Sequence, residues 1–153
     1  MAFKDIGSLE SALKAEITSA MHKELGDVMK QELASSANAN VYSRPKGKTY
    51  QRREGLGQEG KYTTEGSGDM SVSVFSEEEF YPYIFVGKNR VRKLSKNAGQ
   101  PDFAWFIDMG GTGDFEEIPE SGYIREAYDT LESGLAVYTL AGALSARGLK
   151  VKL

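Results

Sequence analysis

The acidic residues of this chain form two short groups that carry the oxygen ligands preferred by divalent cations. One group is the run of three glutamates at 77–79, and the other is Asp114, Glu116 and Glu117. Neither has the alternating spacing of a calcium-binding loop, and adjacent acids cannot aim all their carboxylates at one point. We therefore interpret both groups as solvated turns and expect no metal ion and no cofactor.

Other combinations of residue types that support catalysis are also incomplete. The glycine-rich run at 110–113 lacks the spacing and the following Lys-Ser/Thr of a phosphate-binding loop. The absence of cysteine and the single histidine, His22, exclude thiolate metal sites, His-pair zinc motifs and most Ser-His or Cys-His arrangements. Asp102 and Asp108 are an acid pair that nothing ties to a nucleophile. The sequence therefore predicts that the protein is not an enzyme.

Charge is distributed unevenly along the chain, which has a net charge of −3. Residues 1–40 carry four basic and six acidic groups, residues 41–96 carry eleven and seven, and residues 97–153 carry four and nine. A basic middle between acidic ends suits a surface that faces nucleic acid, or one that faces the acidic end of a neighbouring copy. Both alternatives stay open.

The size and composition of the chain indicate one folded domain over residues 1–153. Apolar residues make up 40% and charged residues 27%, which is typical of a soluble fold. No apolar run approaches the roughly 20 residues of a membrane span, and the first residues lack a signal-peptide core. We expect a protein that is made in a cytoplasm and has no membrane contact.

Apolar residues at helical spacing predict two long helices. In the first, over residues 8–36, an apolar residue recurs every four positions from Leu9 to Leu33, and Ser8 is the expected N-cap. The second, over residues 121–147, has one apolar face from Ile124 onward and a glycine stop at Gly148.

The region between these helices predicts an extended arm and a small antiparallel sheet. Residues 41–69 are rich in glycine and have few apolar anchors, so we expect a flexible arm. Residues 70–120 hold strand patterns at 70–75 and 80–86 and a short helix at 103–109. The predicted fold class is α+β, with the C-terminal helix packed on the sheet.

Two groups of residues in this region are candidates for binding. Aromatic and arginine side chains are enriched at protein interfaces, and this predicts contact between subunits through the arm, with base stacking or a solvated loop as alternatives. The arm residues are Tyr42, Tyr50, Arg52 and Arg53. A denser basic run would suit a DNA channel or a connector contact, with a solvated loop as the alternative. Its residues are Lys88, Arg90, Arg92 and Lys93.

An aromatic segment, an acidic loop that contains Pro119, and a helix start follow one another in the last third of the chain. This order resembles the tail-completion, or head-tail joining, family of long-tailed bacteriophages, in which Tyr-Ala-x-Phe-Val-Glu-x-Gly-Thr precedes Phe-Leu-Arg-Pro-Ala. The residues that match are Ala104, Trp105, Phe106, Asp108, Gly110, Thr112, Ile124, Arg125 and Ala127. Asp108 replaces the family's glutamate, an extra glycine precedes Thr112, and Glu126 stands where the family has proline.

The resemblance implies a structural virion protein of the phage neck, assembled in the host cytoplasm. Copies of the chain would form a ring, expected to be a hexamer, that joins the head connector or adaptor proteins to the tail terminator or tail tube. DNA in the channel would make non-specific contacts with this ring. The alternatives are a tail terminator or another tail-ring component, and a nucleic-acid-binding protein that uses the basic region 44–96.

Overall fold

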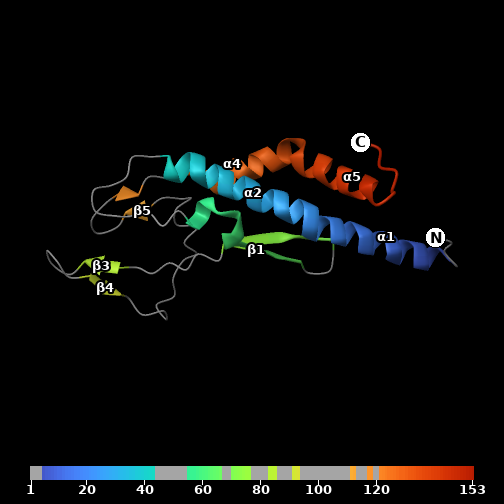
Figure 1. Cartoon of the computed structure of the whole chain (residues 1–153), viewed down its shortest axis with the longest axis horizontal. Coiled ribbons are helices and arrows are strands. Elements are labelled where there is room, and N and C mark those ends of the chain that lie inside the picture. Colours follow the sequence, from blue (N-terminus) through green and yellow to red (C-terminus); the bar gives the residue numbers. More distant parts are fainter. Residues whose placement is uncertain are drawn as a thin grey trace.

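The described part of the chain is mostly helical, with a small two-stranded antiparallel sheet and a C-terminal helix (Figure 1). A computed structural model places these elements. The residues that it describes are 5–43, 55–66, 70–76, 83–85, 91–93, 111–112, 117–118 and 121–153.

A long N-terminal helix extends from Ile6 to Tyr42. Its segments are α1 (Ile6–Ala20), the π-helical turn η1 (Met21–Leu25), α2 (Gly26–Ala37) and the π-helical turn η2 (Asn38–Tyr42). Asp5 is the N-cap: its carboxylate accepts from the Ser8 backbone N–H at 2.7 Å, and the Ser8 hydroxyl accepts from the Asp5 N–H at 3.3 Å. A helix is present over the predicted range 8–36, but it begins at Ile6 and continues to Tyr42, past the expected start of the arm, and Ser8 closes a capping box instead of acting as the N-cap.

The C-terminal helix consists of α4 (Tyr123–Thr130), the π-helical turn η5 (Leu131–Leu135) and α5 (Ala136–Ala146). Gly134 kinks it at φ 124°. The helix ends at Ala146, and Gly148 just beyond it has a φ of 84°, in the left-handed region that glycine adopts without steric cost. The helix expected over 121–147 and its glycine stop are therefore confirmed.

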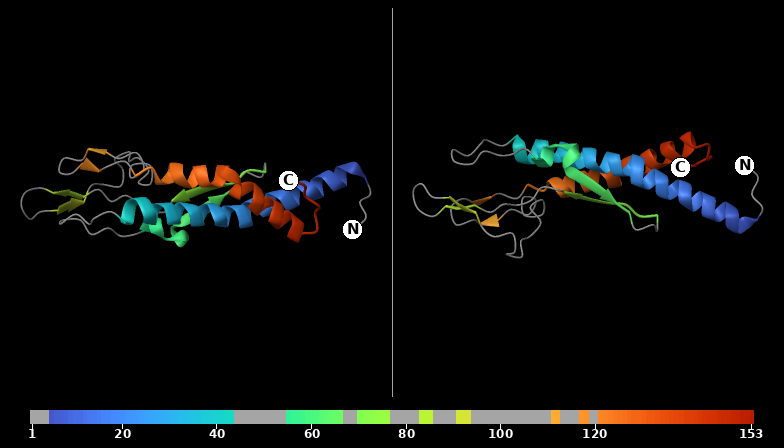
Figure 2. Two further views of the ribbon diagram at one scale, coloured as in Figure 1. Left: turned by 90° about the horizontal axis from the view of Figure 1, so that it is seen from above. Right: turned by 60° about the horizontal axis from the view of Figure 1, so that its bottom comes forward.

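The two long helices pack antiparallel, with α4 on α2 and α5 on η1 and α1 (Figure 2). Small side chains dominate the buried positions of both helices and let the helix axes approach closely. These buried alanines are Ala20, Ala34, Ala37, Ala127, Ala141 and Ala143. The sequence pattern predicts that the C-terminal helix packs on the sheet. Its principal packing partner is instead the long N-terminal helix, because the buried alanines of both helices allow them to pack closely.

An antiparallel hairpin packs against α2. Its strands are β1 (Tyr62–Glu65) and β2 (Ser73–Ser76), in the register Tyr62↔Ser76 to Glu65↔Ser73. A Cβ atom built on Gly26 would lie 2.8 Å from Thr64 Cγ2, so the glycine lets β1 approach the helix backbone. The strand expected at 70–75 is thus present, shifted toward the C-terminus.

Two further strand pairs are short. β3 (Tyr83–Phe85) pairs with β4 (Val91–Lys93), and β5 (Gly111–Thr112) pairs with β6 (Glu117–Ile118), both antiparallel. β3 falls within the strand expected at 80–86. The helix expected at 103–109 lies outside the described residues.

Part of the expected arm belongs to the core. Residues 55–66 form the 3-10 turns η3 (Gly55–Gly57) and η4 (Glu59–Lys61) and strand β1. Leu56 is fully buried against Ala37 and Tyr123, and the Tyr62 hydroxyl donates to the Leu56 carbonyl at 2.8 Å. These two apolar anchors hold a glycine-rich segment in place. Residues 44–54 and 67–69 of the expected arm lie outside the described part.

Candidate functional site

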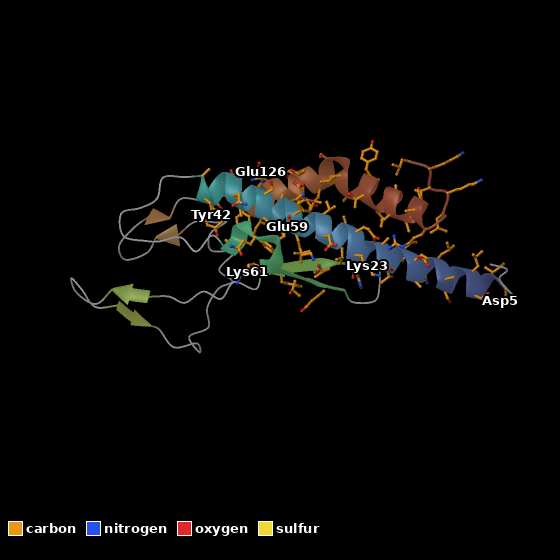
Figure 3. All side chains as sticks on the ribbon, in the orientation of Figure 1. Asp5, Lys23, Tyr42, Glu59, Lys61 and Glu126 are labelled. Carbon is orange, nitrogen blue, oxygen red and sulfur yellow. The ribbon has the colours of Figure 1, made fainter. Side chains whose placement is uncertain are left out.

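The residues predicted for subunit contact are placed only in part. Tyr42 is half-buried in η2, and its hydroxyl accepts a hydrogen bond from the Leu56 N–H at 3.0 Å (Figure 3). This hydrogen bond lies within one chain, and the role of Tyr42 in subunit contact stays a prediction. Tyr50, Arg52 and Arg53 lie outside the described residues, and their role in subunit contact stays a prediction.

Two residues of the basic run, Arg92 and Lys93, lie on β4. Arg92 pairs with Ile84 and Lys93 pairs with Tyr83 in the antiparallel register of β3 and β4. Lys88 and Arg90 lie outside the described residues. The proposed contact of this run with a channel or a connector stays a prediction.

The structure describes only the later residues of the family-like motif, from Thr112 onward. Ala104, Trp105, Phe106, Asp108 and Gly110 lie outside the described part, while Thr112 pairs with Glu117 between β5 and β6. The second half of the motif opens α4. Here Ile124 packs on the core cluster of Ala37, Leu56 and Tyr123, while Ala127 is buried and Arg125 is exposed. The second half thus joins the C-terminal helix to the end of the long helix.

Glu126, at the family's proline position, connects these two helices (Figure 3). Its carboxylate accepts hydrogen bonds from the Ser36 hydroxyl at 3.3 Å and from the Asn40 side-chain amide. Asn40 also donates to the Ser36 carbonyl at 3.1 Å. Sequence reasoning did not find this cluster, because its partners are far apart in the chain and share no local pattern.

A second polar cluster holds the other end of the helix pair. Arg147 Nη2 lies 2.8 Å from both carboxylate oxygens of Glu24, and its Nε lies 3.3 Å from Glu16 Oε2. The hydrogen bond from Arg147 lowers the pKa of Glu24 below its ordinary value of 4.5, against an opposing effect of burial. The guanidinium thus ties the end of α5 to both η1 and α1.

His22 fastens the hairpin to the long helix. Its Nε2 lies 3.0 Å from the Ser71 carbonyl oxygen, so this nitrogen carries the proton and donates. Gly66 packs against the same ring, since a Cβ atom built on it would overlap the ring. His22 is half-buried, and its hydrogen bond lies within one chain.

Two further kinds of feature are absent from the part of the chain that the structure describes. Among these residues, no group of three or more His, Asp or Glu side chains is arranged to hold a metal ion. Likewise, none of their helices combines the length and apolar character that crossing a membrane would require.

Among the described residues, large apolar side chains are exposed at Tyr128 on α4, at Met70 and Phe75 in and beside β2, and on two surfaces of the helix pair that we name here. The N-terminal surface consists of Ile6, Leu9 and Leu13 on α1. The C-terminal surface consists of Val137 and Tyr138 on α5 together with the tail at 150–153, which includes Val151 and Leu153. Exposed apolar residues that lie together on a surface are typical of contact with another macromolecule. No family model, curated protein or solved structure matches this chain.

Proposed function

We propose that this protein is a structural component of the neck of a long-tailed bacteriophage, where a ring of its copies joins the head connector to the tail. The observation that carries the proposal is the order of the segment at 104–112, the acidic loop and the segment at 124–127. In this chain the second segment opens α4, the helix through which the C-terminal part packs along the long helix.

The distribution of exposed apolar residues supports an assembling protein. Ile6 at one end of α1 is 83% exposed, and Tyr138 on α5 is 68% exposed. Burial of such side chains in a contact between copies would remove their apolar area from water, which favours association. A ring needs two different surfaces on each copy, and the N-terminal and C-terminal surfaces of the described residues differ from each other.

The basic hairpin and the arm supply the remaining contacts in this proposal. Arg92 and Lys93 on β4, with Lys88 and Arg90, would face the channel or the connector, where phosphate attraction needs no sequence-specific geometry. The ring would be located in the virion, between the connector or adaptor proteins and the tail terminator or tail tube.

Electron microscopy of particles made without this gene tests the proposal. Filled heads beside finished but unattached tails are expected, because the two halves of the particle form independently and lack only the joining ring. Tails of abnormal length would instead indicate a tail-terminator ring. Normal infectious particles would contradict any role in the neck or tail.

A nucleic-acid-binding protein is the second candidate, favoured by the excess of basic residues at 41–96. It predicts that the isolated protein binds DNA with an affinity that falls steeply with salt, because each neutralised phosphate releases about one counterion. Filter-binding or anisotropy measurements at several salt concentrations give this slope. Affinity that is absent at low salt would remove this candidate.

A further inference from the structure

The first turns of α1 extend beyond the region that the C-terminal helix covers (Figures 1 and 2). Nearly all residues from Asp5 to Glu16 are exposed. The capping box at Asp5 and the Glu10–Lys14 ion pair of 2.8 Å support the helix locally in this region. Such local terms are small, and most helical stability in proteins comes from packing of an apolar face. The exposed segment therefore has the features of a helix that packs on another surface.

The N-terminal surface belongs to an apolar stripe whose other end packs against α5 of the same chain. Ile6, Leu9 and Leu13 follow one another at helical spacing, and the same stripe goes on to Ile17 and Ala20. Ala20 is fully buried where α5 packs on α1 and η1, and Ile17 is half-buried. The apolar face of the long helix is thus covered by α5 at Ala20 and exposed from Leu13 to Ile6.

The charge of the exposed helix segment is opposite to that of the C-terminal surface. Residues 5–16 carry three acidic side chains and one basic side chain. Residues 136–153 carry Arg147, Lys150 and Lys152 and no acidic side chain. Arg147 is already held by Glu16 and Glu24 of its own chain, whereas Lys150 and Lys152 are exposed. The two surfaces therefore match in both apolar character and charge.

We infer that the N-terminal surface of one copy packs on the C-terminal surface of the next copy, as a head-to-tail contact. This inference rests on the proposed ring and names the surfaces that build it. An antiparallel arrangement brings Asp5 and Glu10 toward Lys150 and Lys152, and it also opposes the two helix dipoles favourably. The exposed segment and α5 have similar lengths, about 17 Å each at 1.5 Å per residue. Because the two surfaces differ, the contact propagates from copy to copy and closes a ring when the rotation permits.

The natural absence of cysteine makes a cross-linking test specific. Full-length chains that carry Leu13→Cys are mixed with chains that carry Val137→Cys and treated with a short bismaleimide. A cross-linked dimer is expected from the mixture, while each variant alone remains monomeric on a denaturing gel. A matched control replaces the first variant with Gln31→Cys, at an exposed position on α2 outside both surfaces, and is expected to give no dimer.

Charge reversal tests the pairing of the two surfaces. Adding Glu10→Lys to the Leu13→Cys chain should lower the yield of dimer several-fold, and adding Lys150→Glu and Lys152→Glu to the Val137→Cys chain should restore it. Glu59→Lys, at an exposed position of η4, is the control and should leave the yield unchanged.

Three results would overturn the inference: no dimer in the mixture, a dimer from Leu13→Cys alone, which indicates a two-fold contact of α1 with α1, or no rescue by the reversed lysines. These results are independent of the gene-deletion experiment. Dimer formation with normal particles in the deletion would refute the neck function alone, and detached tails without this dimer would refute this contact alone.

Discussion

Arg147 and Glu24 are 123 positions apart in the sequence, yet Arg147 Nη2 lies 2.8 Å from each oxygen of the Glu24 carboxylate. The same guanidinium donates through Nη1 to the Ala143 carbonyl at 3.0 Å, within the last turn of α5. One side chain thus completes the C-terminal end of a helix and joins that end to the long N-terminal helix. The contacts of Arg147 thus join the end of the C-terminal helix to α1 and η1.

Replacement of Arg147 should weaken this junction. Arg147→Ala is expected to lower the melting temperature by about 2–4 °C, because it removes the contacts to Glu24, Glu16 and Ala143 together with the packing of the arginine stem. Calorimetry of the purified chain measures the change. Lys150→Ala, at an exposed position just beyond the helix, should shift the transition by less than this. Equal melting temperatures for Arg147→Ala and the natural chain would mean that the junction contributes nothing.

The stability of the protein should fall in acid partly through Glu24. Because its pKa is lower in the folded chain than its ordinary value of 4.5, its contribution is present above about pH 4.5 and is lost as the pH falls through the folded pKa. Glu24→Gln should reduce this acid dependence in urea-unfolding series between about pH 6 and pH 3. Parallel pH profiles for the variant and the natural chain would refute the assignment.

Gly66 should be intolerant of any side chain. A methyl group there would overlap the His22 ring, so Gly66→Ala should either displace the ring and break its bond to Ser71 or move the hairpin. A loss of about 1–3 kcal/mol in unfolding free energy is expected from this overlap. Gly60→Ala is the matched control, since nothing lies within 4 Å of the position that its methyl group would take. The double variant His22→Ala, Gly66→Ala should recover part of the loss, and failure to do so would place its cause elsewhere.

Leu56 should be a core residue despite its glycine-rich surroundings. Leu56→Ala is expected to cost about 2–5 kcal/mol of unfolding free energy, because it leaves a cavity beside Ala37 and Tyr123. Leu9→Ala, on the exposed part of α1, should change stability by no more than about 0.5 kcal/mol. Chemical denaturation of the two variants measures the difference. Similar values for both would contradict the buried position of Leu56.

The arm hypothesis can be tested without damage to the core by deletion of residues 44–54 alone, with a short Gly-Ser linker in their place. Residues 55–66 must remain, because they contribute the buried side chains of Leu56 and Tyr62 and the hydrogen bonds that the Leu56 backbone makes with Tyr42 and Tyr62. The shortened chain should fold, as judged by circular dichroism, and fail to form rings under electron microscopy. Rings formed by the shortened chain would show that Tyr50, Arg52 and Arg53 are not needed for assembly.

The two long helices, and the end of the second one, could be predicted from local patterns. The spacing from Leu9 to Leu33 and the face that begins at Ile124 each repeat within one segment, so helix type follows from periodicity alone. Gly148 could be recognised as a stop because a left-handed residue after a helix favours glycine. The N-cap was missed by three residues, since Asp5 and Ser8 are both good capping residues and only their mutual hydrogen bonds distinguish their roles.

The packing partners could not be predicted in this way. The pattern of the C-terminal helix indicates an apolar face but not whether a sheet or another helix covers it, and the small size of Ala127, Ala141 and Ala143 has its effect only when a second helix is near. Leu56 and Tyr62 have the pattern of isolated apolar residues in a loose arm, yet both are buried, and Leu56 packs against the distant residues Ala37 and Tyr123.

The sequence by itself thus determined the helix and strand types, the charge distribution and the family-like motif, because each is a property of neighbouring residues. Only the tertiary structure decided which residues meet: Arg147 with Glu24, His22 with Ser71, and Glu126 with Ser36. It also decided which part of the apolar stripe on α1 is covered and which part, from Ile6 to Leu13, is exposed. The physical reason is that burial and pairing across long sequence separations depend on how the whole chain packs, and no local pattern records that packing.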